Sequence, residues 1–523
     1  MNYYKIILLS ILTAIFGVFV AGIVVLIIYV NSKWAIIGTV IGIVLVDLAF
    51  GCWILLSKRD SDVKLCWLFF VLGVPIFGWL FYVFFGNNIQ GAIQKKKNIR
   101  GWLYLKKYED EKRQIDAKDV NSRIRNIYMY NEKASATSVF MNNGMEIIED
   151  NADLYKKTID LIRSAKKQIN IITFILKDSV YFRTVCAELI KKSKEGIKVA
   201  LIYDWFGAFG HVHKQTIKEL KQAGIKVARF NPPNWNFING ALNFRNHQKA
   251  IIIDNDVALY GGSNISDEYL SISKEYNYFK DINYIVKGKI VSSLTIAFMH
   301  NWLYFTIYSR RYIKKIREED NELIDYTSKH SLLSSYNSKE KNYMQLVKYL
   351  PNVTEKTVEQ TIVSLITNAK KSIKLTTPYF CPPDSIVEAL KTAALSGIDV
   401  EMIFPHRSDN KYFMIVNNRK ECEIILRSGA KVYEYGGFNH SKYLIIDDQY
   451  VFTGSNNLDY RSLWMNFESS LLIESTNVAR NLIKVFNEDK KHSIPIDVKT
   501  LSKYDSISNR TIRAVTRFFY PLI

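Results

Sequence analysis

The stretch Asn246–Asp254 reads Asn-His-Gln-Lys-Ala-Ile-Ile-Ile-Asp, and Asn439–Asp447 repeats it as Asn-His-Ser-Lys-Tyr-Leu-Ile-Ile-Asp. Each copy is followed by a turn that contains glycine and asparagine, Gly261–Asn264 after the first and Gly454–Asn457 after the second. The chain has only eight histidines in 523 residues. Two matched copies are therefore strong evidence for a paired site, whereas a single copy would often be an ordinary histidine at the start of a strand.

Both motifs contain a continuous apolar run, Ala250–Ile253 in the first and Tyr443–Ile446 in the second, with the length and composition of a buried strand. Side chains alternate between the faces of a strand, so the histidine and the lysine two positions later point to the same side. The aspartate lies at an odd separation from the histidine, which puts it on the opposite face of an unbroken strand. We therefore predict a supporting role for Asp254 and Asp447, not a role as general bases.

Two histidines suit displacement at phosphorus. One neutral imidazole attacks to form a covalent phosphohistidine, while the other, protonated, donates to the leaving alcohol; the roles reverse when a second alcohol attacks. Lysine ammonium groups and asparagine amides would neutralise the oxygens of the transition state. The predicted set is His247, Lys249, Asp254 and Asn264 with His440, Lys442, Asp447 and Asn457. The scheme requires no metal or other cofactor, and the residues alone do not tell which histidine attacks.

Two glutamates that follow the motifs, Glu268 and Glu468, are predicted to hydrogen-bond the imidazoles and orient them. Surface salt bridges are the alternative for both. Because neither half of the chain contains both histidines, the active site is expected at the interface between two halves.

The internal repeat extends beyond the motifs. Three segment pairs match: Ser164–Thr173 with Asn368–Thr377, Glu195–Val199 with Ser396–Val400, and Ala223–Val227 with Ser428–Val432. Each half thus alternates amphipathic helices with strands. That order indicates an α/β class built from βαβ units, with a largely parallel sheet covered by helices on both faces.

The pattern His-x-Lys-x4-Asp-x6-Gly-x2-Asn, present twice, resembles the phospholipase D superfamily. The flanks, Arg245–His247 with Gly261–Tyr269 and Asn466–Glu468, are similar to those of bacterial cardiolipin synthases, and so are the apolar N-terminus and the Arg513–Ile523 tail. The chain departs from the family at Phe279-Lys280-Asp281, where Trp-Arg-Asp is usual. The resemblance implies that His247 is the nucleophile and His440 the acid.

The resemblance also implies the architecture: two tandem phospholipase D-like α/β/α halves with a pseudo-twofold interface, preceded by two to three transmembrane helices. The expected regions are a membrane-spanning part (1–86), a basic juxtamembrane linker (87–135), the first half (136–309), a linker (310–345), the second half (346–490) and a basic amphipathic tail (491–523).

Composition agrees with a membrane-surface enzyme. Lys and Arg outnumber Asp and Glu by 70 to 50, a formal charge of +20, which favours an anionic partner, either nucleic acid or an acidic membrane surface. Ile6–Val30 and Trp34–Ser57 are long enough to cross a bilayer. Leu65–Phe85 contains Pro75 and either spans or re-enters; a span is favoured. These segments confine the site near lipid and argue against a nucleic-acid substrate.

Basic residues after Phe85 place the catalytic halves on the cytoplasmic side of a multi-pass protein in the cell membrane. Five scattered cysteines without a disulfide framework are consistent with this side. The expected reaction joins two phosphatidylglycerols into cardiolipin and glycerol, with anionic lipids as partners. The alternatives are a phospholipase D-type hydrolase, phosphatidyl transfer to another acceptor lipid, and a non-catalytic scaffold that binds anionic lipid. The sequence is silent on the oligomeric state.

Overall fold

The computed structural model describes residues 33–57, 61–86, 105, 114–232, 244–273, 278–306, 334, 336, 338–351, 353–354, 356–406, 412–502 and 506–519. The chain forms two units, and each is considered by itself. The first comprises Met1–Gly91 with Pro233–Leu242 and Leu522, and the second comprises the remainder.

In the first unit, helix α2 (Lys33–Leu56) is the one described helix that is long and apolar enough to cross a membrane. Its segment Ile36–Leu56 has 21 residues and a mean hydropathy of 2.4, and only 11% of its most apolar part is buried. Asp47, the one acid of this helix, accepts a hydrogen bond from Trp79 Nε1 at 2.6 Å. The predicted span Ile6–Val30 lies outside the described residues.

The segment predicted as a third span is not one continuous helix. Leu65–Phe85 is divided among α3 (Ser61–Gly73), α4 (Phe77–Phe81) and the π-helix η1 (Tyr82–Gly86). The chain turns at Pro75 and Ile76, whose φ of 69° is incompatible with a continuing helix. A Cβ on Gly78 would lie 2.7 Å from the carbonyl oxygen of Phe70, so α4 packs back on α3.

The second unit contains both motifs, each in its own mixed sheet. The first half has a seven-stranded sheet, and the second half has a nine-stranded sheet, one edge strand of which comes from the start of the first half. In order across the sheet, the first runs β2 (Gly144–Ile148), β9 (Asn283–Lys287), β7 (Val257–Gly261), β6 (Ala250–Ile253), β3 (Gln168–Thr173), β4 (Lys198–Asp204) and β5 (Lys226–Phe230). The second runs β1 (Val139–Met141), β10 (Tyr343–Tyr349), β19 (Glu468–Glu474), β17 (Tyr450–Gly454), β16 (Tyr443–Ile446), β11 (Ser372–Thr376), β13 (Asp399–Pro405), β14 (Lys431–Tyr435) and β20 (Ser493–Ile496).

The expectation of a largely parallel sheet needs correction. Among the described strands of the two large sheets, only β3–β4–β5 and β11–β13–β14 are parallel, while the motif strands β6 and β16 run antiparallel to both neighbours. For the pairing with the next strand, β7 or β17, the cause is a tight turn after each motif strand. It contains two left-handed residues, Asp254 (φ 53°) and Asn255 (φ 58°) in one half and Asp447 (φ 52°) and Asp448 (φ 54°) in the other. Such turns reverse the chain into a hairpin, which makes the strands antiparallel.

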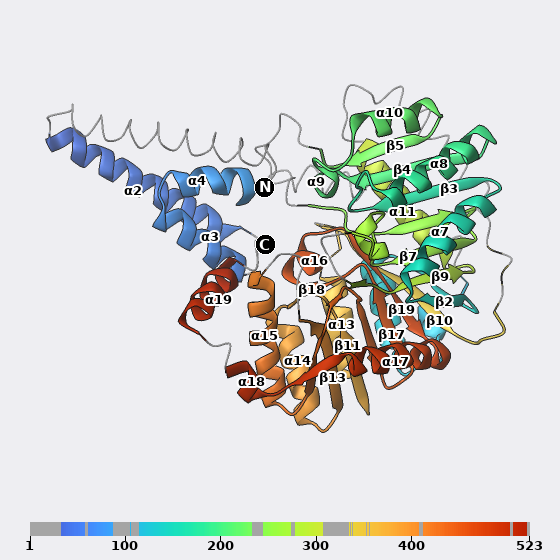
Figure 1. Cartoon of the computed structure of the whole chain (residues 1–523). Coiled ribbons are helices and arrows are strands. Elements are labelled where there is room, and N and C mark those ends of the chain that lie inside the picture. Colours follow the sequence, from blue (N-terminus) through green and yellow to red (C-terminus); the bar gives the residue numbers. More distant parts are fainter. Residues whose placement is uncertain are drawn as a thin grey trace. The chain divides into compact units, whose positions relative to one another are not determined.

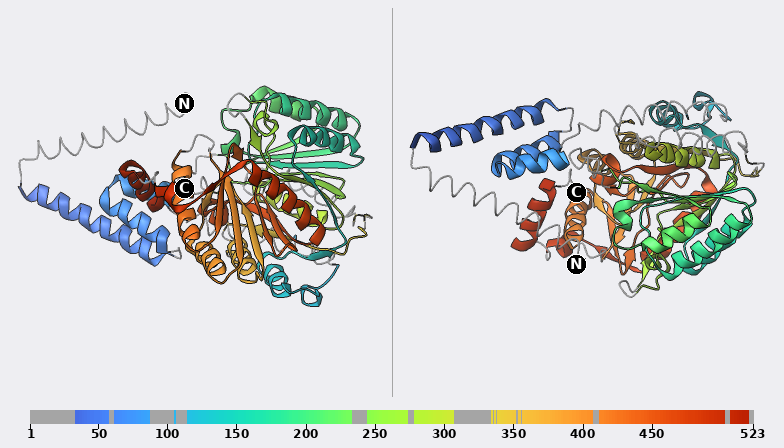
Figure 2. Two further views of the ribbon diagram at one scale, coloured as in Figure 1. Left: turned by 60° about the horizontal axis from the view of Figure 1, so that its bottom comes forward. Right: turned by 90° about the horizontal axis from the view of Figure 1, so that it is seen from above.

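Helices cover both faces of both sheets, as predicted. The outer layers are α7 (Asn151–Ser164), α8 (Val180–Lys194) and α10 (Lys214–Gln222) in the first half, and α13 (Thr357–Thr367), α14 (Asp384–Leu395) and α15 (Tyr412–Arg427) in the second (Figure 1). Helices α11 (Val291–Thr306) and α17 (Thr476–Lys491) pack between the two sheets within one apolar cluster. The first half, mainly green, and the second half, mainly orange and red, form two lobes (Figure 2).

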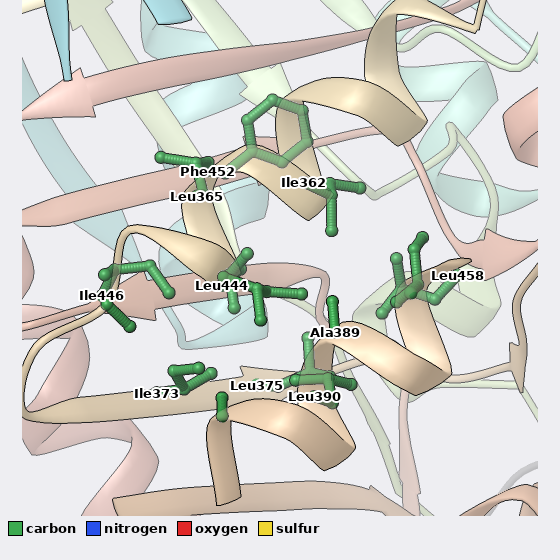
Figure 3. Packing of buried hydrophobic residues seen from close by; sticks show 14 of the residues in the cluster. Ile362, Leu365, Ile373, Leu375, Ala389, Leu390, Leu444, Ile446, Phe452 and Leu458 are labelled. Atoms are coloured by element: carbon green, nitrogen blue, oxygen red, sulfur yellow. The ribbon is translucent and has the colours of Figure 1, made fainter. Parts of the chain in front are cut away.

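The outer core of the second half shows why the motif strand is apolar on both faces. Leu444 and Ile446 of β16 point with Phe452 of β17 towards Ile362 and Leu390 of helices α13 and α14 (Figure 3). The residues that alternate with them, Tyr443 and Ile445, belong instead to the apolar cluster between the two sheets. A strand buried on both faces reads as a continuous apolar run.

The C-terminal tail contains α18 (Val498–Ser502) and the amphipathic helix α19 (Ile507–Phe519). Helix α19 contacts α15, where Asn417 Nδ2 donates to Thr516 Oγ1 and Tyr412 donates to Asn509 Oδ1. The predicted amphipathic helix is therefore present, and it is held against the second half.

Candidate active site

Each histidine-bearing segment is hydrogen-bonded to the opposite half. Strand β15 (Phe438–Asn439) pairs in parallel with β8 (Phe279–Lys280), and the His440 amide donates to the carbonyl of Lys280 at 2.7 Å. In the equivalent contact, Asn246 forms a parallel bridge to Phe467, and the His247 amide donates to its carbonyl at 2.9 Å. These two contacts bring the motif histidines together at the interface between the halves.

The imidazole of His247 is held by a carboxylate from the second half. Its Nδ1 lies 2.8 Å from Oε1 of Glu468, whose other oxygen accepts a hydrogen bond from Ser455 Oγ. The ring of Phe174 packs edge-on against the imidazole, with the ring centroids 5.1 Å apart. Because a carboxylate accepts, Nδ1 carries the proton and Nε2 keeps its lone pair.

The imidazole of His440 is held by a carboxylate from the first half. Its Nδ1 lies 2.7 Å from Oδ2 of Asp281, and Oδ1 of Asp281 accepts the amide proton of Ile282 at 2.9 Å. Lys442 Nζ lies beside the same ring, 2.8 Å from Nδ1 and 3.3 Å from Nε2. The rings of Phe279 and Phe438 enclose it, with centroids 5.4 and 5.6 Å from the imidazole.

Each imidazole is thus held by a carboxylate from the opposite half, and only one of these two carboxylates was predicted. Glu468 contacts an imidazole as expected, but Glu268 forms an ion pair with Lys177 and touches neither ring. Asp281 occupies the expected position of Glu268 beside His440. The repeat carried a usable signal, since Asp281 follows the first motif much as Glu468 follows the second.

Both histidines line one cavity of about 340 Å³. The predicted asparagines Asn264 and Asn457 line it as well. Asn264 also supports the wall, because its Oδ1 accepts from the amide of Ile175 at 2.9 Å and its Nδ2 donates to the Tyr269 hydroxyl at 2.7 Å. The predicted lysines are buried beside the histidines, with Lys249 Nζ 2.5 Å from the carbonyl of His247 and Lys442 Nζ bonded to that of His440.

The cavity lining changes character from one side to the other. Around His440 the wall is an apolar cluster made of Tyr269, Phe279, Tyr379, Cys381, Met414 and Phe438. Arg245 lines the cavity next to His247 and is paired with the buried Asp204 at 3.4 Å. Arg461 on α16 (Tyr460–Trp464) lines it too. Sequence reasoning assigned neither arginine. A cavity with cations and aromatic rings suits an amphiphilic anion.

Burial sets the protonation of the site. It lowers the pKa of His247 to about 4, against the raising effect of Glu468. Burial and the Lys442 ammonium lower the pKa of His440 to about 3, against the raising effect of Asp281. Burial raises the pKa of Glu468, but His247 and Lys249 more than offset this and lower it. Both imidazoles are therefore neutral near pH 7, and an anion bound between them would raise the pKa of each.

The motif aspartates lie away from the cavity, in the turns at the far ends of their strands. Asp254 accepts the amide protons of Lys166, Lys167 and Gln168, each at 2.8 Å. Asp447 accepts those of Lys370, Lys371 and Ser372 at 2.7 to 3.1 Å, and also pairs with Arg123. Each carboxylate fixes the start of the neighbouring antiparallel strand, β3 or β11, a geometry that fits the supporting role predicted for it.

Comparisons with known proteins agree with this geometry. A family model described as "Cardiolipin synthase, PLD-like domain" matches residues 158–302 and 362–490. A second, "Phospholipase_D-nuclease N-terminal", matches residues 40–87. Fold and site thus define a two-motif protein of the phospholipase D superfamily. Within it, the chain belongs to the cardiolipin synthase family.

Relatives match along most of their length. The chain is 30% identical over 482 residues to "Cardiolipin synthase 2" of Bacillus anthracis, covering 90% of this chain and 89% of that one. It is 30% identical over 473 residues to "Cardiolipin synthase" of Clostridium perfringens strain 13, covering 90% and 96%. The crystal structure of phosphatidylserine synthase from Haemophilus influenzae Rd KW20 is similar in fold, with a TM-score of 0.56 at 18% identity, covering 75% of this chain and 97% of that one.

Proposed function

We propose that the chain is a phosphatidyltransferase of the cardiolipin synthase type, which joins two phosphatidylglycerols into cardiolipin and glycerol. One observation carries the proposal. The two motif histidines line one cavity, and each presents Nε2 because its Nδ1 is held by a carboxylate of the opposite half. Family membership supports the same activity.

In the first step, Nε2 of His247 attacks the phosphorus of phosphatidylglycerol. A phosphorus–nitrogen bond forms and the bond to the glycerol oxygen breaks, while Nε2 of His440 donates its proton to that oxygen. His440 is neutral in the empty cavity, so it must take up a proton from solvent when the substrate binds, because the phosphate anion raises the pKa of the imidazole. The family resemblance supports this division of roles.

In the second step, His440 accepts the proton of a hydroxyl on a second phosphatidylglycerol. That oxygen attacks phosphorus, the bond to His247 breaks, and cardiolipin leaves. Lys249 Nζ donates to the backbone carbonyl of His247, and Lys442 Nζ lies beside the imidazole of His440. From these positions their charge would stabilise the oxygens of the transition state. The guanidinium groups of Arg245 and Arg461 are placed to bind a second phosphate in the same cavity.

Membrane attachment fits a lipid substrate. Helix α2 exposes apolar side chains along most of its length and is long enough to span. We infer a multi-pass protein with its catalytic halves on the cytoplasmic side, since basic residues follow the apolar region. Anionic lipids, and not nucleic acid, are the inferred partners of the basic surface.

Hydrolysis on the same scaffold is the rival, because water could replace the acceptor alcohol. The apolar wall around His440 favours a lipid acceptor over water. The full chain in mixed micelles with phosphatidylglycerol labelled in its acyl chains and in its terminal glycerol separates the two. We expect labelled cardiolipin with one glycerol released per cardiolipin formed.

Phosphatidic acid as the sole acyl-labelled product, with one labelled glycerol released per phosphatidic acid, would instead assign a hydrolase. Absence of any turnover would favour the non-catalytic scaffold. Replacing phosphatidylglycerol as acceptor by phosphatidylethanolamine or a glycolipid in the same assay tests transfer to other lipids.

A further inference from the structure

The asparagine that precedes each histidine is anchored on a central helix. Asn439 Nδ2 donates to Oδ2 of Asp489 on α17 at 3.0 Å, and Asn246 Nδ2 donates to Oδ1 of Asn301 on α11 at 2.9 Å. Each asparagine oxygen then accepts the amide proton two residues further on, at 3.0 Å from Ser441 and 3.2 Å from Gln248. The segments that carry the two histidines are therefore held by equivalent sets of hydrogen bonds, which we call braces: each joins the preceding asparagine to a central helix and to the amide two residues further on.

The braces differ in charge. On the His440 side, the Asp489 carboxylate also forms a buried ion pair with Lys280; the two residues are 1% and 6% exposed. On the His247 side, the position of Asp489 is taken by the neutral Asn301. The position of Lys280 is taken there by Phe467, which packs on Phe230. The second carboxylate near Lys280, Glu149, is more distant, at 3.9 Å, and more exposed.

The Lys280–Asp489 ion pair is connected through the backbone to His440 and Asp281. The Lys280 carbonyl accepts the His440 amide proton, and the next residue is Asp281, which holds the imidazole. Asp489 thus contacts both Lys280, the residue before Asp281, and Asn439, the residue before His440. Both members of the pair line a second cavity, of about 500 Å³, which contains neither motif histidine. Any effect of the ion pair on catalysis must therefore act through His440 and Asp281.

We propose that Lys280 and Asp489 form a positioning pair that sets the geometry of His440 and Asp281, and so serves the proton-transfer half of the site but not the nucleophile. The inference rests on the proposed function. A charge-assisted bond in a buried site fixes geometry more firmly than the neutral amide contact of the other half. Proton transfer depends closely on the placement of the donor.

The test varies the leaving group. An alkyl alcohol such as glycerol needs the proton from His440, whereas p-nitrophenol is acidic enough to leave without it. The double variant Lys280→Met/Asp489→Asn removes both charges together, which avoids a lone buried charge, and keeps an acceptor for Asn439. We expect glycerol release from phosphatidylglycerol to slow by roughly ten- to a hundredfold. The p-nitrophenol burst from phosphatidyl-p-nitrophenol and the KM for phosphatidylglycerol should stay near wild type.

Two further variants complete the test. Lys280→Arg retains the ion pair and should retain both rates, which covers the case in which the double variant does not fold. Asn301→Ala, which removes the acceptor for Asn246 on the His247 side, should slow both substrates alike. Equal losses on the two substrates in the double variant, or a selective loss of glycerol release in Asn301→Ala, would overturn the proposal. His440→Ala separates this from a failure of the proposed function: if it slows both substrates equally, the acid role itself is wrong.

Discussion

Alanine in place of His247 is expected to abolish cardiolipin formation and the p-nitrophenol burst together, because no other described side chain is placed to attack phosphorus in the same position. Loss of a covalent nucleophile costs on the order of 10⁶-fold in other enzymes. His440→Ala should differ in kind. It should slow phosphatidylglycerol turnover by about 10²–10⁴-fold, the usual worth of general acid–base catalysis, and spare the activated substrate. Membranes from cells without other synthases provide the assay.

A matched control is available in the same unit. His406 Nδ1 lies 2.7 Å from Oε2 of Glu434, the same kind of histidine–carboxylate contact, but His406 does not line the cavity. His406→Ala should therefore leave both assays unchanged. Full activity in either motif-histidine variant would refute the two-imidazole scheme.

Removal of an orienting carboxylate should have the second large effect on activity. A change in one half should impair the histidine of the other half. Glu468→Gln, a change in the second half, should impair the nucleophile of the first, and Asp281→Asn in the first half should impair the acid of the second. We expect losses of roughly 10²–10⁴-fold, because an amide that replaces the carboxylate no longer selects the tautomer with a free Nε2.

The direction in which the pH–rate profile should move in these variants follows from the pKa shifts of the imidazoles. Each carboxylate raises the pKa of its imidazole, so its removal lowers a pKa that is already about 4 for His247 and about 3 for His440. The acid limb of the rate of p-nitrophenol release should move to lower pH in Glu468→Gln. Comparing the two leaving groups tests the crossed pairing directly. Asp281→Asn should slow the release of alkyl alcohols such as glycerol and leave the release of p-nitrophenol unchanged. If Glu468→Gln were the leaving-group-selective variant, the crossed pairing would be wrong.

The paired site was accessible from sequence because the chemistry repeats. Two copies of His-x-Lys on buried strands required two halves that meet, and the repeated helix–strand segments predicted α7–β3 and α13–β11. The direction of the motif strands was not accessible. Runs such as Ala250–Ile253 are buried on both faces, and that burial pattern is the same for parallel and antiparallel neighbours. Only the two left-handed residues after the strand reveal the hairpin.

The crossed carboxylates were missed for a different reason. Glu268 lies close to the first motif in sequence, but Asp281 reaches His440 because β8 pairs with β15 of the other half. Contacts between halves are not visible in local sequence. Hydropathy likewise cannot locate the break at Pro75 and Ile76, since the apolar run continues through it.

The most direct test of two imidazoles acting on one phosphorus is to isolate the intermediate. The full chain is incubated with phosphatidyl-p-nitrophenol labelled at phosphorus and quenched in base, in which a phosphorus–nitrogen bond survives. The labelled residue is then identified by peptide mass spectrometry. The account predicts label on His247, accumulating further in His440→Ala and absent from His247→Ala. Label that persists in His247→Ala, or turnover without any labelled histidine, would contradict it.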